Sequence, residues 1–172
     1  MALVSVLRYM SDNQIRSADV RMLPRSVQVL DFSRNRLQIL MGFDQLQNLQ
    51  NLDVSGNSLS DESVSFLRQM ENLAVLDISD NKIEEIDSLL RLVSVRALKL
   101  KGNSVTASPY TPQLIEALPA LRCLDETLFS REETLHVPAE DECSLSLDRD
   151  TLGSLRARQA EYYRNGRDPI TL

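Results

Sequence analysis

Few residues in this sequence could carry out chemistry. His136 is the only histidine, and neither Cys123 nor Cys143 has a second cysteine or a histidine close by. A nucleophile needs an activating base beside it, and a zinc site needs several such ligands at short spacings. The sequence also has no glycine-rich loop that could cradle a phosphate. It therefore predicts no catalytic residue, no metal site and no cofactor, and we do not expect an enzyme.

One cluster of carboxylates superficially resembles a calcium-binding loop. It lies between residues 77 and 87 and consists of Asp77, Asp80, Glu84, Glu85 and Asp87. A calcium loop beginning at Asp77 would need glycine at its middle and glutamate at its end. The sequence has Lys82 and Ser88 at those two positions. We therefore interpret the cluster as a solvated acidic turn.

The charge distribution argues against direct contact with nucleic acid. The net charge is −6, and residues 1–125 hold 15 acidic and 13 basic side chains, whereas residues 126–172 hold 10 and 6. Most of the imbalance thus belongs to the C-terminal segment, and no basic face is available to neutralise phosphates. The apolar run of residues 1–7 stops at Arg8, too short for a membrane span or a signal peptide. We expect neither nucleic acid nor a membrane as a direct partner.

The sequence repeats. Five asparagines recur at spacings of 22, 22, 24 and 22 residues, namely Asn13, Asn35, Asn57, Asn81 and Asn103. Around the last four, the segments VQVLDFSRNRL, LQNLDVSGNSL, LAVLDISDNKI and VRALKLKGNSV share the form LxxLxLxxNxL. The first repeat begins at Ser5 and has polar residues at consensus leucine positions, as expected of a terminal repeat.

This repeat predicts an α/β fold, a right-handed leucine-rich repeat solenoid. A short strand directs the fourth and sixth positions inward, and the asparagine turns back to satisfy backbone groups along the stack. Parallel strands then line the concave side. The return segments have aliphatic residues at every third position, as from Ile83 to Val95, which is typical of short helical or 3-10 turns. The longer return after Asn57 predicts a helix capped by Ser60.

The segment YTPQLIEALPALRCLD, from Tyr110 to Asp125, makes the resemblance more specific. With the repeats it resembles the intracellular leucine-rich repeat family of the protein-phosphatase-1 regulatory-subunit type. That family includes the spliceosomal A-prime protein and the axonemal outer-arm dynein light chain. The resemblance implies an interaction module that ends in a C-terminal cap, here residues 106–125. The residues that match the cap are Tyr110, Leu114, Leu118, Pro119, Leu121, Leu124 and Asp125.

The outward strand positions predict a partner-binding face on the concave side. The candidates are Tyr9, Val29, Asp31, Asn51, Asp53, Val75, Asp77, Lys99 and Lys101. Position five forms an acidic column that continues to Asp125, beside an apolar column at position three, which suits a basic or amphipathic protein segment. The Asp-x-Ser-x-Asn pattern is common in such repeats whatever they bind. The less generic valines and lysines therefore carry more information.

Two interpretations of residues 126–172 stay open. This extension contains the acidic run AEDEC and then a predicted helix over residues 148–167, with Leu152 and Leu155 one turn apart and several arginines and tyrosines. The helix could shield the open end of the solenoid formed by residues 1–125. It could instead be an arm that binds a partner.

These observations favour a protein-binding adaptor or scaffold within a larger intracellular assembly, which could be axonemal or cytoskeletal. A ribonucleoprotein subunit that contacts RNA mainly through a partner protein is the alternative. We expect a cytoplasmic location, with the cytoskeleton, the flagellum and the nucleus as other compartments. The sequence does not indicate an oligomeric state.

Overall fold

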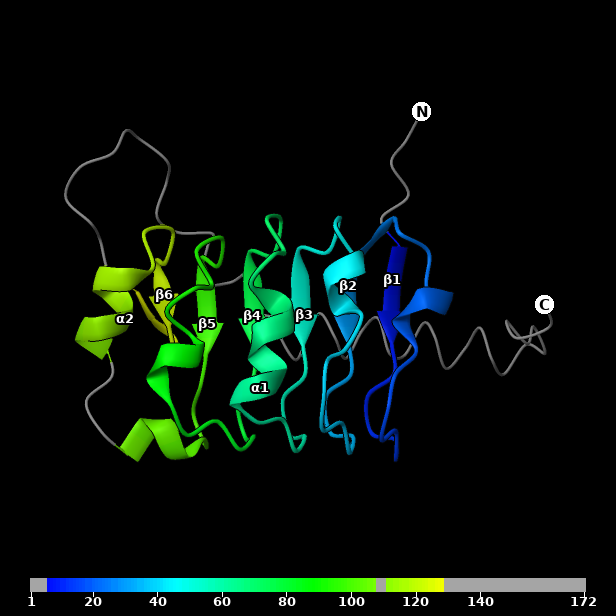
Figure 1. The fold of residues 1–172 in the computed structure, drawn as a ribbon, viewed down its shortest axis with the longest axis horizontal. Coiled ribbons are helices and arrows are strands. Elements are labelled where there is room, and N and C mark those ends of the chain that lie inside the picture. The colour runs from blue at the N-terminus through cyan, green and yellow to red at the C-terminus, as the bar shows by residue number, and fades with distance from the viewer. Residues whose placement is uncertain (1–5, 108–110, 129–172) are drawn as a thin grey trace.

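Seven short strands form one sheet along the length of the computed structural model, which describes residues 6–107 and 111–128 (Figure 1). The strands lie side by side in chain order, and the first six are parallel, whereas the last pairs antiparallel with the sixth. They are β1 (Val6–Tyr9), β2 (Val27–Asp31), β3 (Asn51–Asp53), β4 (Val75–Asp77), β5 (Ala97–Lys99), β6 (Cys123–Leu124) and β7 (Thr127–Leu128).

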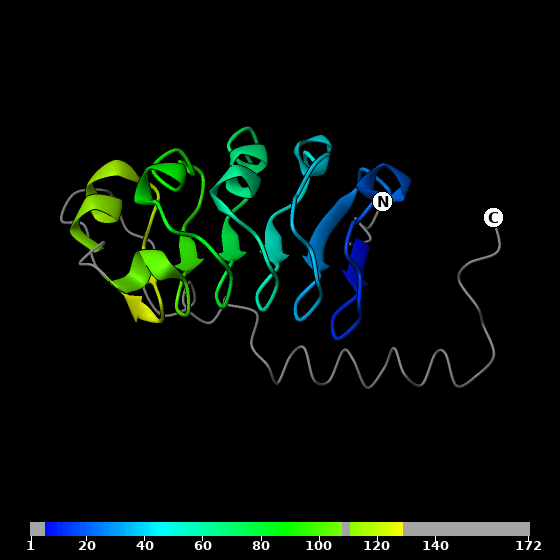
Figure 2. The ribbon, with the colours of Figure 1, turned by 60° about the horizontal axis from the view of Figure 1, so that its bottom comes forward.

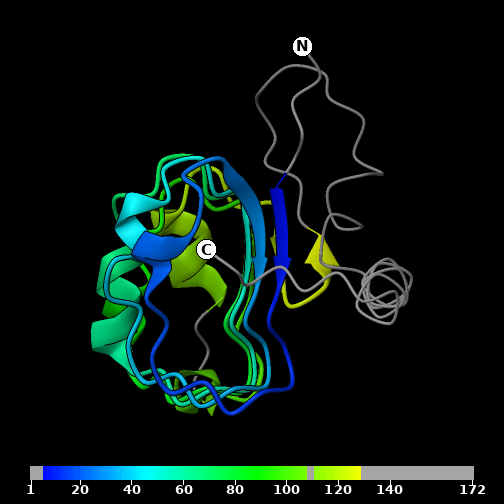
Figure 3. The same ribbon diagram turned by 90° about the vertical axis from the view of Figure 1, so that its right-hand side faces the viewer.

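Helical turns return the chain from each strand to the next. The 3-10 helices are η1 (Val20–Met22), η2 (Phe43–Gln45), η3 (Ser65–Leu67), η4 (Ile86–Ser88) and η5 (Ser104–Ala107), and the α-helices are α1 (Asp61–Val64) and α2 (Thr111–Ala117). The strands line one side of the solenoid and the helical turns line the other (Figures 2 and 3). The two extra residues in the repeat after Asn57 give α1, which runs directly into η3.

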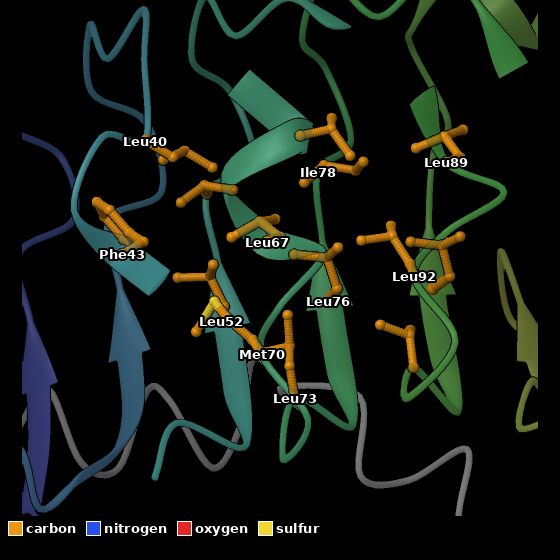
Figure 4. Packing of buried hydrophobic residues seen from close by; sticks show 14 of the residues in the cluster. Leu40, Phe43, Leu52, Leu67, Met70, Leu73, Leu76, Ile78, Leu89 and Leu92 are labelled. Carbon is orange, nitrogen blue, oxygen red and sulfur yellow. The ribbon is translucent and has the colours of Figure 1, made fainter. Parts of the chain in front are cut away.

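The repeat register is set by one inward leucine in each strand. Leu30, Leu52, Leu76, Leu98 and Leu124 pair across neighbouring strands. The first four are fully buried and the last is 3% exposed. Each meets the helical turns behind it, and the labelled residues of Figure 4 show this packing around Leu52, Met70 and Leu76. One continuous aliphatic core thus runs through the stack, because no single repeat can bury its own apolar face.

The turn after each strand uses the left-handed backbone region. The residue before the repeat asparagine has a positive φ in every repeat: Asp12 (58°), Arg34 (53°), Gly56 (63°), Asp80 (52°) and Gly102 (78°). Glycine adopts this conformation without strain, whereas a side chain makes it less favourable. At Gly102 a side chain would also collide, since a Cβ there would lie 2.0 Å from Oδ1 of Asp80.

The repeat asparagines link each turn to the preceding repeat. Oδ1 of Asn81 accepts from the backbone N–H of Leu59 at 3.0 Å, while its Nδ2 donates to the carbonyls of Val54, Ile78 and Ser79 at 3.0 to 3.1 Å. Asn35 and Asn57 make the same set of contacts in their own repeats. Oδ1 of Asn103 accepts from the N–H of Ile83, and its Nδ2 donates to the carbonyls of Ile78 and Leu100. Within the described residues, Asn13 donates only inside its own turn, to the carbonyls of Met10 and Ser11.

The convex helix α1 has no side-chain hydrogen bond that caps its N-terminus. Ser60 occupies the N-cap position of α1, but its side chain makes no capping hydrogen bond, so the predicted Ser60 cap is wrong. Asp61, the first residue of α1, instead accepts from the backbone of Glu84 and Glu85 and from the Ser88 hydroxyl, at 3.0 to 3.2 Å. The carboxylate therefore ties α1 to the next convex turn.

At the C-terminal end, α2 and the two last strands complete the described chain. Leu114, Leu118 and Leu121 are fully buried and belong to the continuous core. Pro119 is exposed, and Tyr110 lies outside the described residues. The sheet continues past Asp125 into β7, so its last hairpin extends into the segment that follows the repeats.

Candidate protein-binding face

The candidate face is built on the outward positions of β1 to β5. Asp31, Asp53 and Asp77 are direct neighbours across β2, β3 and β4, followed in register by Lys99 of β5, and Tyr9 of β1 pairs with Asp31. Because alternate residues of a strand point to opposite faces, the burial of the leucine before each aspartate directs these side chains to the concave side. The structure thus places Tyr9 and the four charged residues in one row, here called the carboxylate stripe.

Each aspartate of the carboxylate stripe uses one oxygen inside its own repeat. Oδ1 of Asp53 accepts from the backbone N–H of Ser55 at 2.9 Å and from its hydroxyl at 2.7 Å. Asp77 makes the same pair of contacts with Ser79, and Asp31 accepts from the Ser33 backbone at 2.8 Å. The Asp-x-Ser pattern therefore has a local structural role, which uses one oxygen of each of these carboxylates.

Lys99 pairs with the nearest carboxylate. Its Nζ lies 3.7 Å from Oδ2 of Asp77, and the two side chains are 25% and 13% exposed. The pair partly compensates the negative charge at the β4–β5 end of the carboxylate stripe. Lys101 is exposed and lies in the turn after β5 rather than in the row itself.

Asp53 lies at the centre of the carboxylate stripe and is 7% exposed. Burial raises the pKa of its carboxyl to about 6, with a further increase from the negative charge of Asp77 and, to a smaller extent, of Asp31. The hydrogen bonds from Ser55 act in the opposite direction and lower that pKa. Asp53 has no salt-bridge partner within the described residues, so a nearby cation would stabilise its ionised form and offset both the cost of desolvation and the repulsion from its neighbours.

An apolar patch lies beside the carboxylate stripe. Val75, Ala97 and Cys123 pair across β4, β5 and β6, are 4 to 6% exposed, and form a small cluster separate from the main core. Val29 and Asn51 continue the same column on β2 and β3 and are half-buried. A shallow hollow at this patch is also lined by Asp77, Lys99 and Glu126. The face therefore offers a small apolar contact next to charges of both signs.

Cys123 is disulfide-bonded. The described residues hold no free cysteine. Residues 6–107 and 111–128 contain no other cysteine, so the bridging residue lies outside the described part of the chain.

Asp125 does not extend the carboxylate stripe as its sequence position predicts. Its Oδ1 accepts from the backbone N–H groups of Leu100 and Lys101 at 2.6 and 3.1 Å, and its φ is 47°. The carboxylate therefore satisfies backbone donors of the last repeat. Glu126, which the sequence interpretation did not include, reaches the hollow because it follows Asp125 in the same left-handed turn, with a φ of 73°. No sequence pattern marks that turn.

Other candidate chemistry is limited in the described chain. In residues 6–107 and 111–128, no group of three or more His, Cys, Asp or Glu side chains could hold a metal ion. His136 and Cys143 lie outside the described residues. Among the helices that the structure describes, none has both the length and the apolar character of a membrane span.

Comparisons with known proteins agree with the repeat architecture. The family described as leucine rich repeat matches residues 47–105. Over 136 residues, the chain is 26% identical to the U2 small nuclear ribonucleoprotein A' of Eremothecium gossypii. The matched region covers 77% of this chain and 57% of that protein. The chain thus spans just over half the length of this relative.

Solved structures share the fold. A leucine-rich repeat protein of Leptospira interrogans superposes with a TM-score of 0.57 at 26% identity, over 67% of this chain and 30% of the other. An internalin of Listeria monocytogenes gives a TM-score of 0.56 at 22% identity, over 69% and 33% of the two chains. Together with the parallel sheet, the helical returns and the asparagine contacts, these matches identify the chain as a leucine-rich repeat solenoid, a fold of protein–protein interaction modules.

Proposed function

We propose that this protein is an adaptor that holds a basic segment of a partner protein against its concave face within a larger assembly. The observation that supports the proposal is the arrangement of Asp31, Asp53 and Asp77 on three adjacent strands. Asp53 is nearly buried there and has no salt-bridge partner within the described residues. A carboxylate in that setting gains most from a cation supplied by a ligand.

The partner segment should combine charge with apolar surface. In the apolar patch, Val75 and Ala97 lie two residues before Asp77 and Lys99 on the same face of β4 and β5. An arginine or lysine opposite Asp53 would therefore place a neighbouring aliphatic or aromatic side chain over this patch. A central buried contact bordered by charges is the usual anatomy of an energetically important interface region.

Affinity purification with the full chain as bait, followed by binding measurements on the recovered partner, tests this proposal. We expect Asp53→Asn to weaken the affinity by about tenfold or more, because it removes the central negative charge. Asp87→Asn is the matched control, since it removes the same charge from η4 on the convex side. Equal affinities of the two variants would contradict binding at the carboxylate stripe.

The second candidate is a subunit of a ribonucleoprotein. The match to the U2 small nuclear ribonucleoprotein A' favours it, although the identity is only 26%. The weakly acidic chain lacks the charge excess needed for a phosphate-binding face, so RNA contact would pass through a partner protein. Recovery of splicing proteins would support this role and a nuclear location. Tight RNA binding by the purified chain alone would contradict contact through a partner.

The resemblance to the phosphatase-regulatory type and to the dynein light chain leads to the same purification with a different outcome. Recovery of axonemal or other cytoskeletal proteins would assign the adaptor to that setting. Recovery of a phosphatase catalytic subunit would assign it to phosphatase regulation. In each case the concave face would still carry the binding, and the Asp53→Asn measurement would apply unchanged.

A further inference from the structure

The carboxylate stripe requires a cation most strongly near β3. At β4, Lys99 already lies 3.7 Å from Asp77. At β3, Asp53 has no salt-bridge partner within the described residues, and the guanidinium of Arg34, which acts on it electrostatically, is hydrogen-bonded to Asp12. Any occupant of the concave face should therefore present its positive charge over β3 and its apolar groups over β4 and β5.

One segment of the chain itself has this composition. Residues 152–167, LGSLRARQAEYYRNGR, contain four arginines and one glutamate, a net charge of +3, together with two leucines and two tyrosines. In the helix that the sequence predicts, Arg156 and Tyr163 follow Leu152 by four and eleven residues. These spacings place the three residues on one helix face. The segment lies outside the described residues, so this placement comes from the sequence alone.

The segment is close enough to reach the carboxylate stripe. The described chain ends at Leu128 in β7, and residues 129–151 precede the segment. Cys123 of β6 is disulfide-bonded, and Cys143 is the only other cysteine in the sequence, so the free part of the connection is residues 144–151. Eight extended residues span up to about 26 Å. Four strand spacings, from β6 to β2, amount to about 19 Å.

The connection itself is a poor occupant of the same face. Residues 129–151 hold seven acidic and two basic side chains, a net charge of −5. The aspartates of the stripe would repel it. The charge pattern of the chain therefore selects residues 152–167 as the part that the stripe can attract.

We propose that residues 152–167 dock on the concave face of their own chain, with Arg156 opposite Asp53 and Tyr163 over the apolar patch. This inference rests on the face assigned under the proposed function and names an internal competitor for it. A partner segment of the same chemistry must then displace the chain's own segment. Its apparent affinity falls in proportion to the fraction of molecules in which the face is free.

A labelled synthetic peptide of residues 148–172, titrated with the full-length protein, tests this docking. We expect weak binding to the wild-type chain, whose face is occupied. Arg156→Glu with Arg167→Glu in the full chain removes the internal competitor, and we expect the peptide to bind at least about tenfold more tightly. Arg131→Glu with Arg149→Glu, the same charge change outside the segment, should leave the affinity at the wild-type value.

Two further variants locate the site of peptide binding. Adding Asp53→Asn to the Arg156→Glu and Arg167→Glu chain should reverse most of the gain, whereas adding Asp87→Asn should not. Equal peptide affinity for the wild-type and double-arginine chains would overturn the proposal, as would no measurable binding to either. A concentration-dependent dimer in sedimentation that disappears in the double-arginine variant would also overturn it, because the segment would then dock on a second copy.

The outcomes separate this inference from the proposed function. If Asp53→Asn weakens partner binding while the peptide binds neither chain, the adaptor proposal stands and the internal docking fails. If the peptide binds through Asp53 while partner binding is insensitive to that residue, the internal docking stands and the proposed function fails.

Discussion

The two sides of the strands follow different rules. Inward, Leu30, Leu52, Leu76 and Leu98 occupy equivalent and fully buried positions. Outward, the adjacent residues have similar sequence contexts and different environments, since Asp53 is nearly buried between two carboxylates whereas Asp77 is paired with Lys99. The inward side thus repeats one packing arrangement along the stack, and the outward side is where the burial and charge environment differs from one repeat to the next.

Removing an inward leucine should have the largest effect on stability. We expect Leu52→Ala to lower the free energy of unfolding by about 2–5 kcal/mol, because it leaves a cavity at a fully buried position. Denaturant titration followed by circular dichroism measures this change. Asn51→Ala, the preceding outward residue on the same strand, serves as the control and should cost far less. Comparable losses would remove the distinction between the two sides.

The asparagine contacts allow a comparison between an inner and an outer repeat. Asn81→Ala removes one acceptor and one donor that together serve four backbone groups. We expect a loss of about 2–3 kcal/mol in the free energy of unfolding, because buried backbone groups lose their partners. Asn13→Ala should cost less than about 1 kcal/mol, since Asn13 is exposed and, within the part of the chain that the structure describes, contacts only its own turn. Equal losses would contradict a stacking role.

Asp53 should give the carboxylate stripe a distinctive dependence on pH. Its pKa of about 6 in the folded chain exceeds the ordinary value of 3.8, so the folded state binds the proton more tightly than the unfolded state. The contribution of Asp53 to the free energy of unfolding therefore falls as pH rises from about 4 to about 6 and is constant above that range. The expected size is up to about 3 kcal/mol.

Comparing wild type with Asp53→Asn isolates this contribution from the other titrating groups. We expect the Asp53→Asn variant to be more stable than wild type at pH 7 and to lose this advantage as pH falls below 4. Denaturant midpoints measured across that range provide the readout. A constant difference between the two proteins would show that Asp53 is not the group responsible.

The Lys99–Asp77 pair should make the smallest contribution. Lys99→Gln should lower the free energy of unfolding by less than about 1 kcal/mol, since its Nζ lies 3.7 Å from Oδ2 of Asp77, too far for a direct hydrogen bond, and the desolvation of the two partly buried charges offsets much of their attraction. Lys101→Gln, in the turn after β5, is the control for loss of one positive charge. Thermal unfolding at low and high salt measures both variants. A larger loss for Lys101→Gln would contradict the pairing of Lys99.

The sequence predicts the solenoid well because its signal is local and repeated. The leucine and asparagine spacings determine which residues face inward, and Leu30, Leu52, Leu76 and Leu98 are buried accordingly. The apolar period of three also predicts the 3-10 returns, where a short segment must close each repeat. The expected helix after Asn57 is present, although it is one turn of α-helix followed by a 3-10 turn.

The details at the ends and on the outward side depend on non-local contacts. Ser60 satisfies the rules for an N-cap, but Asp61 makes the cross-repeat contact instead. Asp125 continues a sequence column, yet its backbone turns and the carboxylate binds two N–H groups. The environment of Asp53 requires knowledge of the neighbouring strands and of burial, which a single repeat does not contain. The sequence thus predicts which face of the sheet a residue occupies, whereas the contacts and electrostatic environment of that residue depend on the neighbouring strands.

The direction of the asparagine contacts has a consequence for how the solenoid frays. Oδ1 of each asparagine from Asn35 to Asn103 receives an N–H from the preceding repeat, and Asp125 receives two from the last. Loss of a C-terminal repeat therefore leaves backbone donors such as the N–H of Leu59 without an acceptor. Loss of an N-terminal repeat removes the acceptors of the next asparagine's Nδ2, as at Asn57, and of backbone donors such as the N–H of Gln50. Both ends of the stack should accordingly fray, with amide hydrogen exchange slowest in the middle repeats.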